Sequence, residues 1–156
     1  MTEQVKPERK GALVTGSSRG IGRAIALSLA EAGMNVCVNC SSERSLPAAQ
    51  ELAAQISATY GVKSLALVAN VASAEEAQTL VESAHTAFGR LDVLVNNAGI
   101  TRDGLLLSMK EADFDAVIDT NLKGAFHMIK HCYSHFMKRR SGRIINISSV
   151  SGLMGN

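Results

Sequence analysis

Short apolar runs alternate with helical patterns along all 156 residues of the chain. The runs suited to buried strands cover residues 12–14, 35–39, 64–69, 91–95 and 144–147. Between them, apolar residues recur every three or four positions, as they do on one face of a helix. Near-continuous apolar strands separated by helices are typical of a parallel sheet covered on both faces. Because such crossovers are right-handed, we expect an α/β fold, a Rossmann-like doubly wound parallel sheet of about five strands.

The apolar positions also predict which face of each helix packs on the sheet. The expected inward residues are Ile21, Ile25 and Leu29 in helix 20–32; Leu46, Ala49, Ala53 and Ile56 in helix 46–60; Ala77, Leu80, Val81, Ala84 and Phe88 in the helix after Ser73; and Leu122, Phe126, Ile129, Tyr133 and Phe136 in a long helix that ends near Arg140. Ser73 with Glu76, and Ser108 with Glu111, have the spacing of capping boxes.

Composition argues against several other classes of protein. The net charge of +2 is too small to indicate a nucleic-acid partner. No apolar run is as long as a membrane span, and residues 1–10 lack the apolar stretch of a secretory signal, so we expect a cytoplasmic protein without a membrane partner. Cys37 and Cys40 lie three apart on one predicted strand, which places them on opposite faces as structural thiols rather than as a redox pair.

His127, His131 and His135 recur every four residues on the last long helix. We expect them to line a solvated or subunit-contact face opposite the apolar one, and we expect no metal site, because no acidic residue lies alongside on that helix. The basic residues 138–140 and Arg143 follow at the end of the same helix. They either complement the helix dipole or form a docking surface for an acidic partner.

A glycine-rich loop, residues 15–22 (T-G-S-S-R-G-I-G), joins the first predicted strand to the first predicted helix. Gly16 allows a sharp turn, and Gly20 and Gly22 allow the backbone to approach a ligand closely. The start of the helix then presents free N–H groups and a positive dipole end. The loop between strand and helix therefore predicts a site for a dinucleotide diphosphate.

Four motifs in order have the pattern of one family. After the glycine loop come Asn96–Gly99 (N-N-A-G), Asn121 in the segment 121–124 (N-L-K-G), and Ser149 in the segment 147–149 (I-S-S). Over essentially its whole length the chain resembles the short-chain dehydrogenase/reductases, and within them it is most similar to the bacterial 3-oxoacyl-acyl-carrier-protein reductases. The resemblance implies a single NAD(P)-binding Rossmann domain over residues 1–156.

The resemblance also implies which residues bind the nicotinamide cofactor. They are Gly16, Ser17, Ser18, Arg19, Gly20, Ile21, Gly22, Ser41, Asn70, Val71, Asn97, Ala98 and Gly99. A site for NAD usually carries an acidic residue at the end of the second strand, whereas residues 38–42 here read V-N-C-S-S. Arg19, with Arg44 as a second candidate, supplies positive charge for a 2′-phosphate, and the resemblance adds Ser41. We therefore expect NADPH.

For catalysis, the resemblance implies that Ser149 positions a substrate carbonyl and that Asn121 holds a water in a proton relay. The family's tyrosine, followed four residues later by a lysine, has no counterpart, because Ser64 and Met137 follow Tyr60 and Tyr133 at that distance. We expect a partial sequence of a longer enzyme, truncated after about five strands and inactive as given. Strand 144–147 would then be an exposed apolar sheet edge.

The leading interpretation is NADPH-dependent reduction of a 3-oxoacyl thioester carried by acyl carrier protein, in fatty acid synthesis. The resemblance implies docking of the carrier at Arg140 and a homo-oligomer formed partly by the last long helix. Two alternatives stay open: a family dehydrogenase for an alcohol, sugar or steroid, and a truncated, non-catalytic nucleotide-binding module. A Y-x-x-x-K motif encoded shortly after Asn156 would favour an enzyme, and a stop codon would favour the module.

Overall fold

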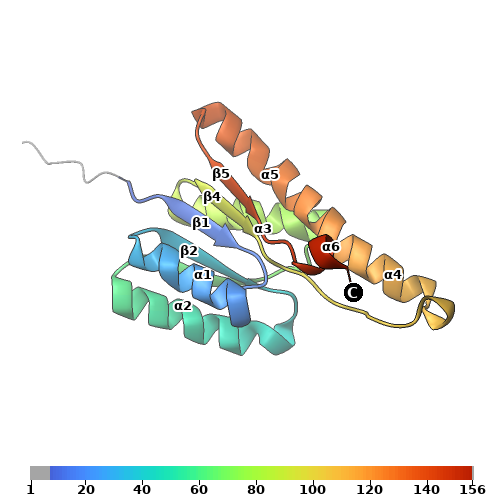
Figure 1. Cartoon of the computed structure of the whole chain (residues 1–156). Helices are drawn as coiled ribbons and strands as arrows, with labels where there is room; N and C mark the ends of the chain where they lie inside the picture. The colour runs from blue at the N-terminus through green and yellow to red at the C-terminus, as the bar shows by residue number, and fades with distance from the viewer. Residues whose placement is uncertain (1–7, 156) are drawn as a thin grey trace, which may run out of the picture.

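The computed structural model describes residues 8–155 and contains one five-stranded parallel sheet (Figure 1). Its strands are β1 (Gly11–Val14), β2 (Asn35–Cys40), β3 (Ser64–Val68), β4 (Val93–Asn96) and β5 (Arg143–Asn146). Their order is β3-β2-β1-β4-β5, and every neighbouring pair is parallel. The chain therefore winds outward from β1 in two directions, as the alternation of strands and helices predicted.

Helices cover both faces of this sheet (Figure 1). They are α1 (Gly20–Glu31), α2 (Leu46–Tyr60), α3 (Ala74–Phe88), α4 (Glu111–Val117), α5 (Gly124–Arg139) and the short α6 (Ser151–Met154), with a π-helical segment, Ile118–Lys123, between α4 and α5. Helices α1 and α2 pack on one face, whereas α3 and α5 pack on the other. Cys37 belongs to the core under α3 and α5, and Cys40 to the core under α1 and α2, as expected for structural thiols on opposite faces.

The buried face of α3 consists of the five residues that the periodicity predicted. Its first turn is capped by Ser73, whose Oγ accepts a hydrogen bond from the Glu76 backbone N–H at 3.3 Å. The carboxylate of Glu76 accepts from Asn70 N at 2.7 Å rather than from Ser73 N. This capping arrangement therefore also fixes the loop after β3.

The predicted inward face of α5 is only partly correct: Phe136 is buried and Ile129 packs against the core. The residues buried in α5 are Gly124, Met128, Cys132 and Phe136, whereas Leu122, Phe126 and Tyr133 are more than half exposed. The buried stripe repeats every four residues, whereas the predicted stripe alternates steps of four and three, and the two meet at Phe136. Gly124, at the start of the buried stripe, allows α5 to approach Val71 closely.

The histidines of α5 are consequently half-buried rather than solvated. His127 Nδ1 lies 2.9 Å from the carbonyl oxygen of Val71, and the ring of His135 stacks on that of His85 with centroids 4.1 Å apart. An acidic side chain does lie alongside, because Glu82 on α3 approaches His135 Nε2 at 3.5 Å. The histidine face therefore packs against α3.

Two smaller predictions also differ from the structure. Ile21 is 66% exposed, and the buried stripe of α1 is Gly22, Ala26 and Ala30. Ser108 does not cap α4, because that helix begins after Lys110 without any side-chain cap. The Ser108 hydroxyl instead donates to the carbonyl of Leu105 at 3.2 Å.

Strand β5 forms one edge of the sheet, as the sequence predicted, and its side chains are exposed. Ile144 and Ile145 are 37% and 45% exposed. Among residues 8–155 no helix is both long enough and apolar enough to span a bilayer.

Candidate functional site

Two adjoining cavities lie at the carboxyl ends of the strands, where the strand order reverses between β1 and β4. One has a volume of about 900 Å³ and extends over the glycine loop and the ends of β2 and β3. The other, of about 580 Å³, lies between the ends of β4 and β5 and the start of α5. Six residues line both: Ile21, Val71, Asn97, Ala98, Gly99 and Ile100. In open parallel sheets this crevice is where ligands bind.

The glycine loop exposes backbone N–H groups to the larger cavity. Arg19 precedes α1 with extended backbone angles and makes no side-chain cap, and the first turn carries no acidic residue. The first intrahelical bond runs from Arg23 N to Arg19 O, so the amides of Gly20, Ile21 and Gly22 have no hydrogen-bond acceptor among the described residues. Free amides at the positive end of a helix are suited to bind an anion.

The three glycines of this loop serve different purposes. Gly16 and Gly20 have φ values of +60° and +57°, in the left-handed region that favours glycine. Gly22 does not line either cavity, and a Cβ there would lie 2.6 Å from the carbonyl oxygen of Gly16 and 2.5 Å from Nδ2 of Asn97. Gly22 thus makes room for the protein's own loops, whereas Gly20 faces open space that a ligand can occupy.

Asn97 and Thr15 join the loops after β1 and β4. The Asn97 side chain donates to the carbonyl oxygens of Thr15 and Gly16, each at 3.0 Å. The Thr15 hydroxyl accepts from the backbone N–H groups of Asn97 and Ala98, also at 3.0 Å. Thr15, which the sequence analysis did not assign to the site, is therefore part of its framework.

Ser17 is fully buried and lines neither cavity. Its hydroxyl donates to Val14 O at 2.7 Å and accepts from Asn39 N at 3.1 Å. The side chain therefore holds the loop against β1 and β2. Ser18 and Arg19, in contrast, line the larger cavity.

Positive charge gathers where this cavity meets the end of β2. Arg19 and Arg44 both line it, together with Ser41, and all three are exposed. Among the described residues no Asp or Glu lines this cavity. The donor set therefore fits a phosphorylated nucleotide, with helix amides for one phosphate group and guanidinium groups for another. Asn70 and Val71 line the side of the cavity next to β3.

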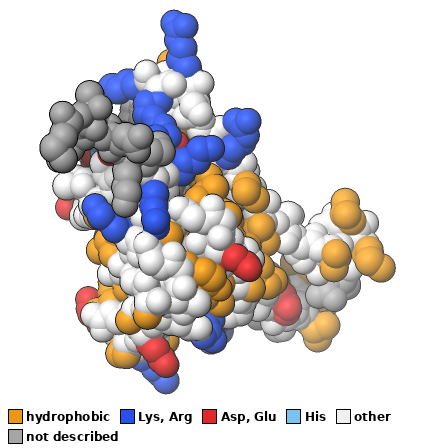
Figure 2. Space-filling view, turned by 90° about the vertical axis from the view of Figure 1, so that its left-hand side faces the viewer, with side chains coloured by type: hydrophobic (Ala, Val, Ile, Leu, Met, Phe, Trp, Pro, Cys, Tyr) orange, Lys and Arg blue, Asp and Glu red, His pale blue; other side chains and the backbone are white. Residues whose placement is uncertain are grey.

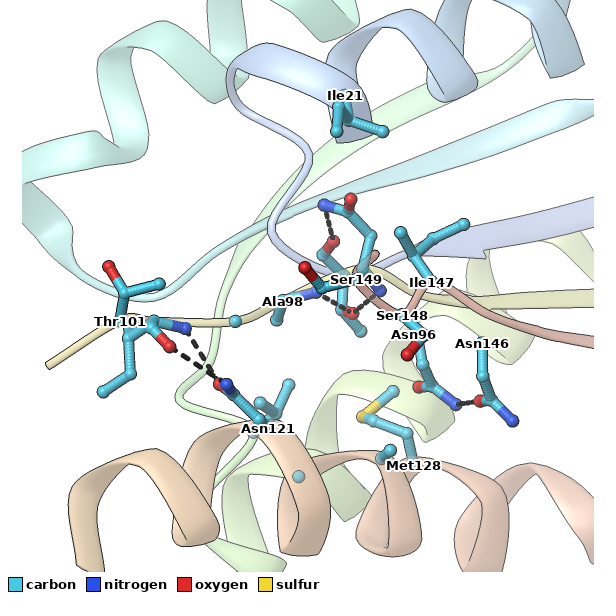
Figure 3. Close-up of a pocket in the computed structure, with 17 residues that line it drawn as sticks. Ile21, Asn96, Ala98, Thr101, Asn121, Met128, Asn146, Ile147, Ser148 and Ser149 are labelled. Carbon is cyan, nitrogen blue, oxygen red and sulfur yellow. Dashed lines mark hydrogen bonds between the residues drawn. The ribbon is translucent and has the colours of Figure 1, made fainter. Parts of the chain in front are cut away.

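Asn121 and Ser149 both line the smaller cavity (Figure 3). The Asn121 amide is occupied by the backbone of Ile100, accepting from its N–H at 2.8 Å and donating to its carbonyl at 2.9 Å. The Ser149 hydroxyl accepts from Ser151 N at 3.2 Å, at the start of α6. Figure 3 shows Ile21 on the α1 side of this cavity and Asn121 with Met128 on the opposite side.

Neither tyrosine reaches either cavity. Tyr60 packs against the core at the end of α2, and Tyr133 is 55% exposed on α5 rather than on its apolar face. Across residues 8–155, no group of three or more His, Cys, Asp or Glu side chains is arranged to hold a metal ion.

Away from the cavities, charged side chains form ion pairs that stabilise the fold. Asp92 accepts from Arg90 at 2.6 Å, from Arg139 at 2.7 Å and from Gly11 N at 2.9 Å. Burial raises the pKa of Asp92, but these hydrogen bonds outweigh it and bring the pKa to about 2. Arg139 is thus bound to the sheet, whereas Arg140 is exposed and ends α5 with a φ of +50°. Cys132 is buried, and this burial raises the pKa of its thiol to about 12, which disfavours the reactive thiolate.

A doubly wound parallel sheet, a glycine loop at a helix start and a cavity at the strand-order reversal are typical of nucleotide-binding domains. Comparison with known proteins is more specific. The family model for short chain dehydrogenases matches residues 10–156, and the chain belongs to that family. The family is one of oxidoreductases, and membership implies a nicotinamide cofactor.

Several relatives of the chain are 3-oxoacyl-[acyl-carrier-protein] reductases. The chain is 54% identical over 149 residues to a 3-oxoacyl-[acyl-carrier-protein] reductase of Staphylococcus aureus, covering 94% of this chain and 58% of that protein. It is 54% identical over 145 residues to such a reductase of Synechocystis, covering 93% and 58%. A solved structure described as a short-chain alcohol dehydrogenase of Sinorhizobium meliloti aligns with a TM-score of 0.88 at 35% identity, covering 94% of this chain and 57% of that one. The chain therefore spans a little under three fifths of the length of these relatives.

Proposed function

We propose that this chain forms the NADPH-binding part of an enzyme that reduces 3-oxoacyl groups, carried on acyl carrier protein, to 3-hydroxyacyl groups in fatty acid synthesis. The observation that carries the proposal is the larger cavity, with its unpaired helix amides, two arginines and no lining carboxylate among the described residues. The names and 51–54% identities of the curated relatives support the choice of substrate.

The preference for NADPH over NADH rests on charge. A 2′-phosphate adds negative charge at the adenine ribose, which a carboxylate at the end of β2 would repel. Here the end of β2 offers Ser41 and the guanidinium groups of Arg19 and Arg44. In this proposal Asn70 and Val71 line the adenine pocket, and the nicotinamide side is lined by Asn97, Ala98 and Gly99.

When bound, the nicotinamide supplies the hydride that reduces the substrate carbonyl. The smaller cavity then has to hold that carbonyl, and Ser149 is the hydroxyl we assign to orient it. We assign Asn121 to the same site, where its amide holds the backbone of Ile100 in the wall of the cavity. Both are positioned by backbone contacts, which favours a preorganised site.

We propose that the acidic carrier protein docks at Arg140. Lys and Arg side chains gather at the top of the face shown in Figure 2, where α5 ends. Arg140 is exposed, and it ends the helix in a left-handed conformation that glycine would adopt with less strain. Arg139 contributes less free charge to this surface, because it is paired with Asp92.

We also propose that the enzyme is a homo-oligomer in which the outer face of α5 is a subunit contact. Leu122, Phe126, Tyr133 and Met137 lie on that face, each between 55% and 64% exposed. A contiguous exposed apolar stripe of this kind is typical of an interaction surface.

The test is a comparison of NADPH and NADH binding, measured by calorimetry on the purified chain and on its Arg19→Ala variant. The wild-type chain is expected to bind NADPH more tightly than NADH. Arg19→Ala should weaken NADPH binding by about tenfold, since a charge-assisted hydrogen bond is lost, and should leave NADH binding within about twofold. Equal loss for both nucleotides would contradict the NADPH assignment.

A further inference from the structure

Asn39 is a polar side chain enclosed at the end of β2, where it is 1% exposed. Its amide oxygen accepts a hydrogen bond from Gly16 N at 3.0 Å. Its amide nitrogen lies within bonding distance of three carbonyl oxygens, those of Cys40 at 3.1 Å, Leu67 at 3.3 Å and Ala69 at 3.1 Å. One side chain thus connects the glycine loop with the ends of both β2 and β3.

The backbone of Asn39 strengthens the same connection. Its carbonyl accepts from Ser17 N at 2.8 Å, and its N–H donates to the Ser17 hydroxyl at 3.1 Å. Three hydrogen bonds therefore run between Asn39 and residues 16–17. The segments they join each form a different wall of the larger cavity, namely the glycine loop, residues 40–42 and residues 69–71.

An amide of this length turns an acceptor toward Gly16 N and shares its two N–H donors among the three carbonyl oxygens. Aspartate would keep the acceptor for Gly16 N, but it would turn a carboxylate oxygen toward three carbonyl oxygens in a buried site. Serine would be too short to reach both sides. Asparagine is also disfavoured within strands, so local propensity does not account for its presence there.

We infer that Asn39 is a positioning residue for nucleotide binding: its amide sets the relative placement of the three walls of the cavity. The Asn39 side chain is uncharged, so its effect on binding comes from the placement of these walls and not from an ionic contact with the ligand. The inference deepens the proposed NADPH-binding function and rests on it.

The strand offers a matched control in Asn35, a 5% exposed asparagine at the opposite end of β2. Its amide oxygen accepts from Lys63 N at 2.9 Å, and the residue lines neither cavity. The experiment compares Asn39→Asp and Asn39→Ser with Asn35→Asp and Asn35→Ser in the full chain. Folding is followed by thermal unfolding, and NADP⁺ affinity by calorimetry on each folded variant.

Both Asn39 variants should bind NADP⁺ about tenfold more weakly, whereas both Asn35 variants should remain within about twofold of the wild type. Asn39→Asp should also recover affinity, relative to the wild type at the same pH, as the pH is lowered from 7.5 to 5.5. The buried carboxyl has a raised pKa, and its protonated form can donate a hydrogen bond again. Asn39→Ser should show no such recovery.

The outcomes separate the two proposals. A folded wild-type chain that binds no nicotinamide nucleotide would overturn the proposed function itself. A wild-type chain that binds, together with Asn39 variants of unchanged affinity, would overturn only the positioning role. If both Asn39 variants fail to fold while both Asn35 variants fold, the role of Asn39 is structural and the inference is wrong.

Discussion

Asn97 donates two hydrogen bonds to Thr15 across the strand-order reversal. The Thr15 hydroxyl accepts from Asn97 N at 3.0 Å, and the Asn97 amide donates to Thr15 O at 3.0 Å. These bonds join the loops after β1 and β4, and both loops line the two cavities. The site therefore depends on a contact between residues 82 positions apart in the chain.

Thr15→Val should test this contact, since valine has the same shape and no hydroxyl. The substitution leaves the N–H groups of Asn97 and Ala98 without their acceptor at a position that is 1% exposed. We expect the free energy of unfolding, measured in urea, to fall by roughly 2–4 kcal/mol. Thr79→Val, on the exposed side of α3, should change it by less than about 0.5 kcal/mol. Equal effects would count against the contact.

Asp92 should make stability depend on acid. Its folded pKa of about 2 is depressed, so its contribution is complete above the unfolded pKa near 3.8 and is lost as the pH falls from there through 2. Asp92→Asn should lower the free energy of unfolding at pH 7 by about 3 kcal/mol, because Arg139 loses its counter-charge. The variant should also lose the pH dependence between 4 and 2.

The control for Asp92 is Asp113→Asn. Asp113 lies 3.8 Å from Arg102 with both side chains about half exposed. Such a pair contributes at most about 1 kcal/mol, so the urea midpoint of this variant should stay close to that of the wild type. A wild-type curve that is flat between pH 4 and 2 would show that the Asp92 cluster does not form.

His85 should produce a second, separate pH dependence at the contact between α3 and α5. Burial lowers the pKa of His85, and the neighbouring His135 lowers it further. The stabilising contribution is therefore present above the unfolded pKa near 6.5 and is lost as the pH falls below it. Thermal unfolding midpoints should drop between pH 7.5 and 5.5, and less so in His85→Phe, which keeps an aromatic ring against His135 without a charge.

The sequence predicted the sheet well because buried parallel strands need continuous apolar runs, and β1 to β5 all have them. It was only partly right for the inner face of α5. Periodicity allows more than one apolar stripe on that helix, and the predicted and the buried stripe share only Phe136. The choice between them depends on how closely α5 can approach the sheet, and Gly124 allows this approach, since a Cβ there would lie 2.6 Å from Val71 Cγ2.

The ligand-facing part of the site followed from the motifs, whereas its framework did not. Gly20 and Arg19 were predicted from the glycine loop, and Ser41 from the family resemblance; the structure has all three lining the larger cavity. Asn39 was overlooked, because its partners come from residues 16, 67 and 69, which are brought together only by the fold. The available signal was an asparagine inside an otherwise apolar strand.

Substitutions of Arg140 should separate the strain at the end of α5 from the proposed role in docking the carrier protein. A non-glycine residue in the left-handed conformation costs roughly 1 kcal/mol, so Arg140→Gly should raise the free energy of unfolding by about that amount, measured in urea. Arg140→Ala should lower it slightly, because alanine retains the strain and loses the contacts of the arginine stem. Under the proposed docking role, both variants should bind acyl carrier protein more weakly than the wild type, by about the same factor, in surface plasmon resonance. If only Arg140→Ala binds the carrier protein more weakly, the strained helix end is the cause and not the lost charge. Both variants lose the charge, but only Arg140→Gly relieves the strain.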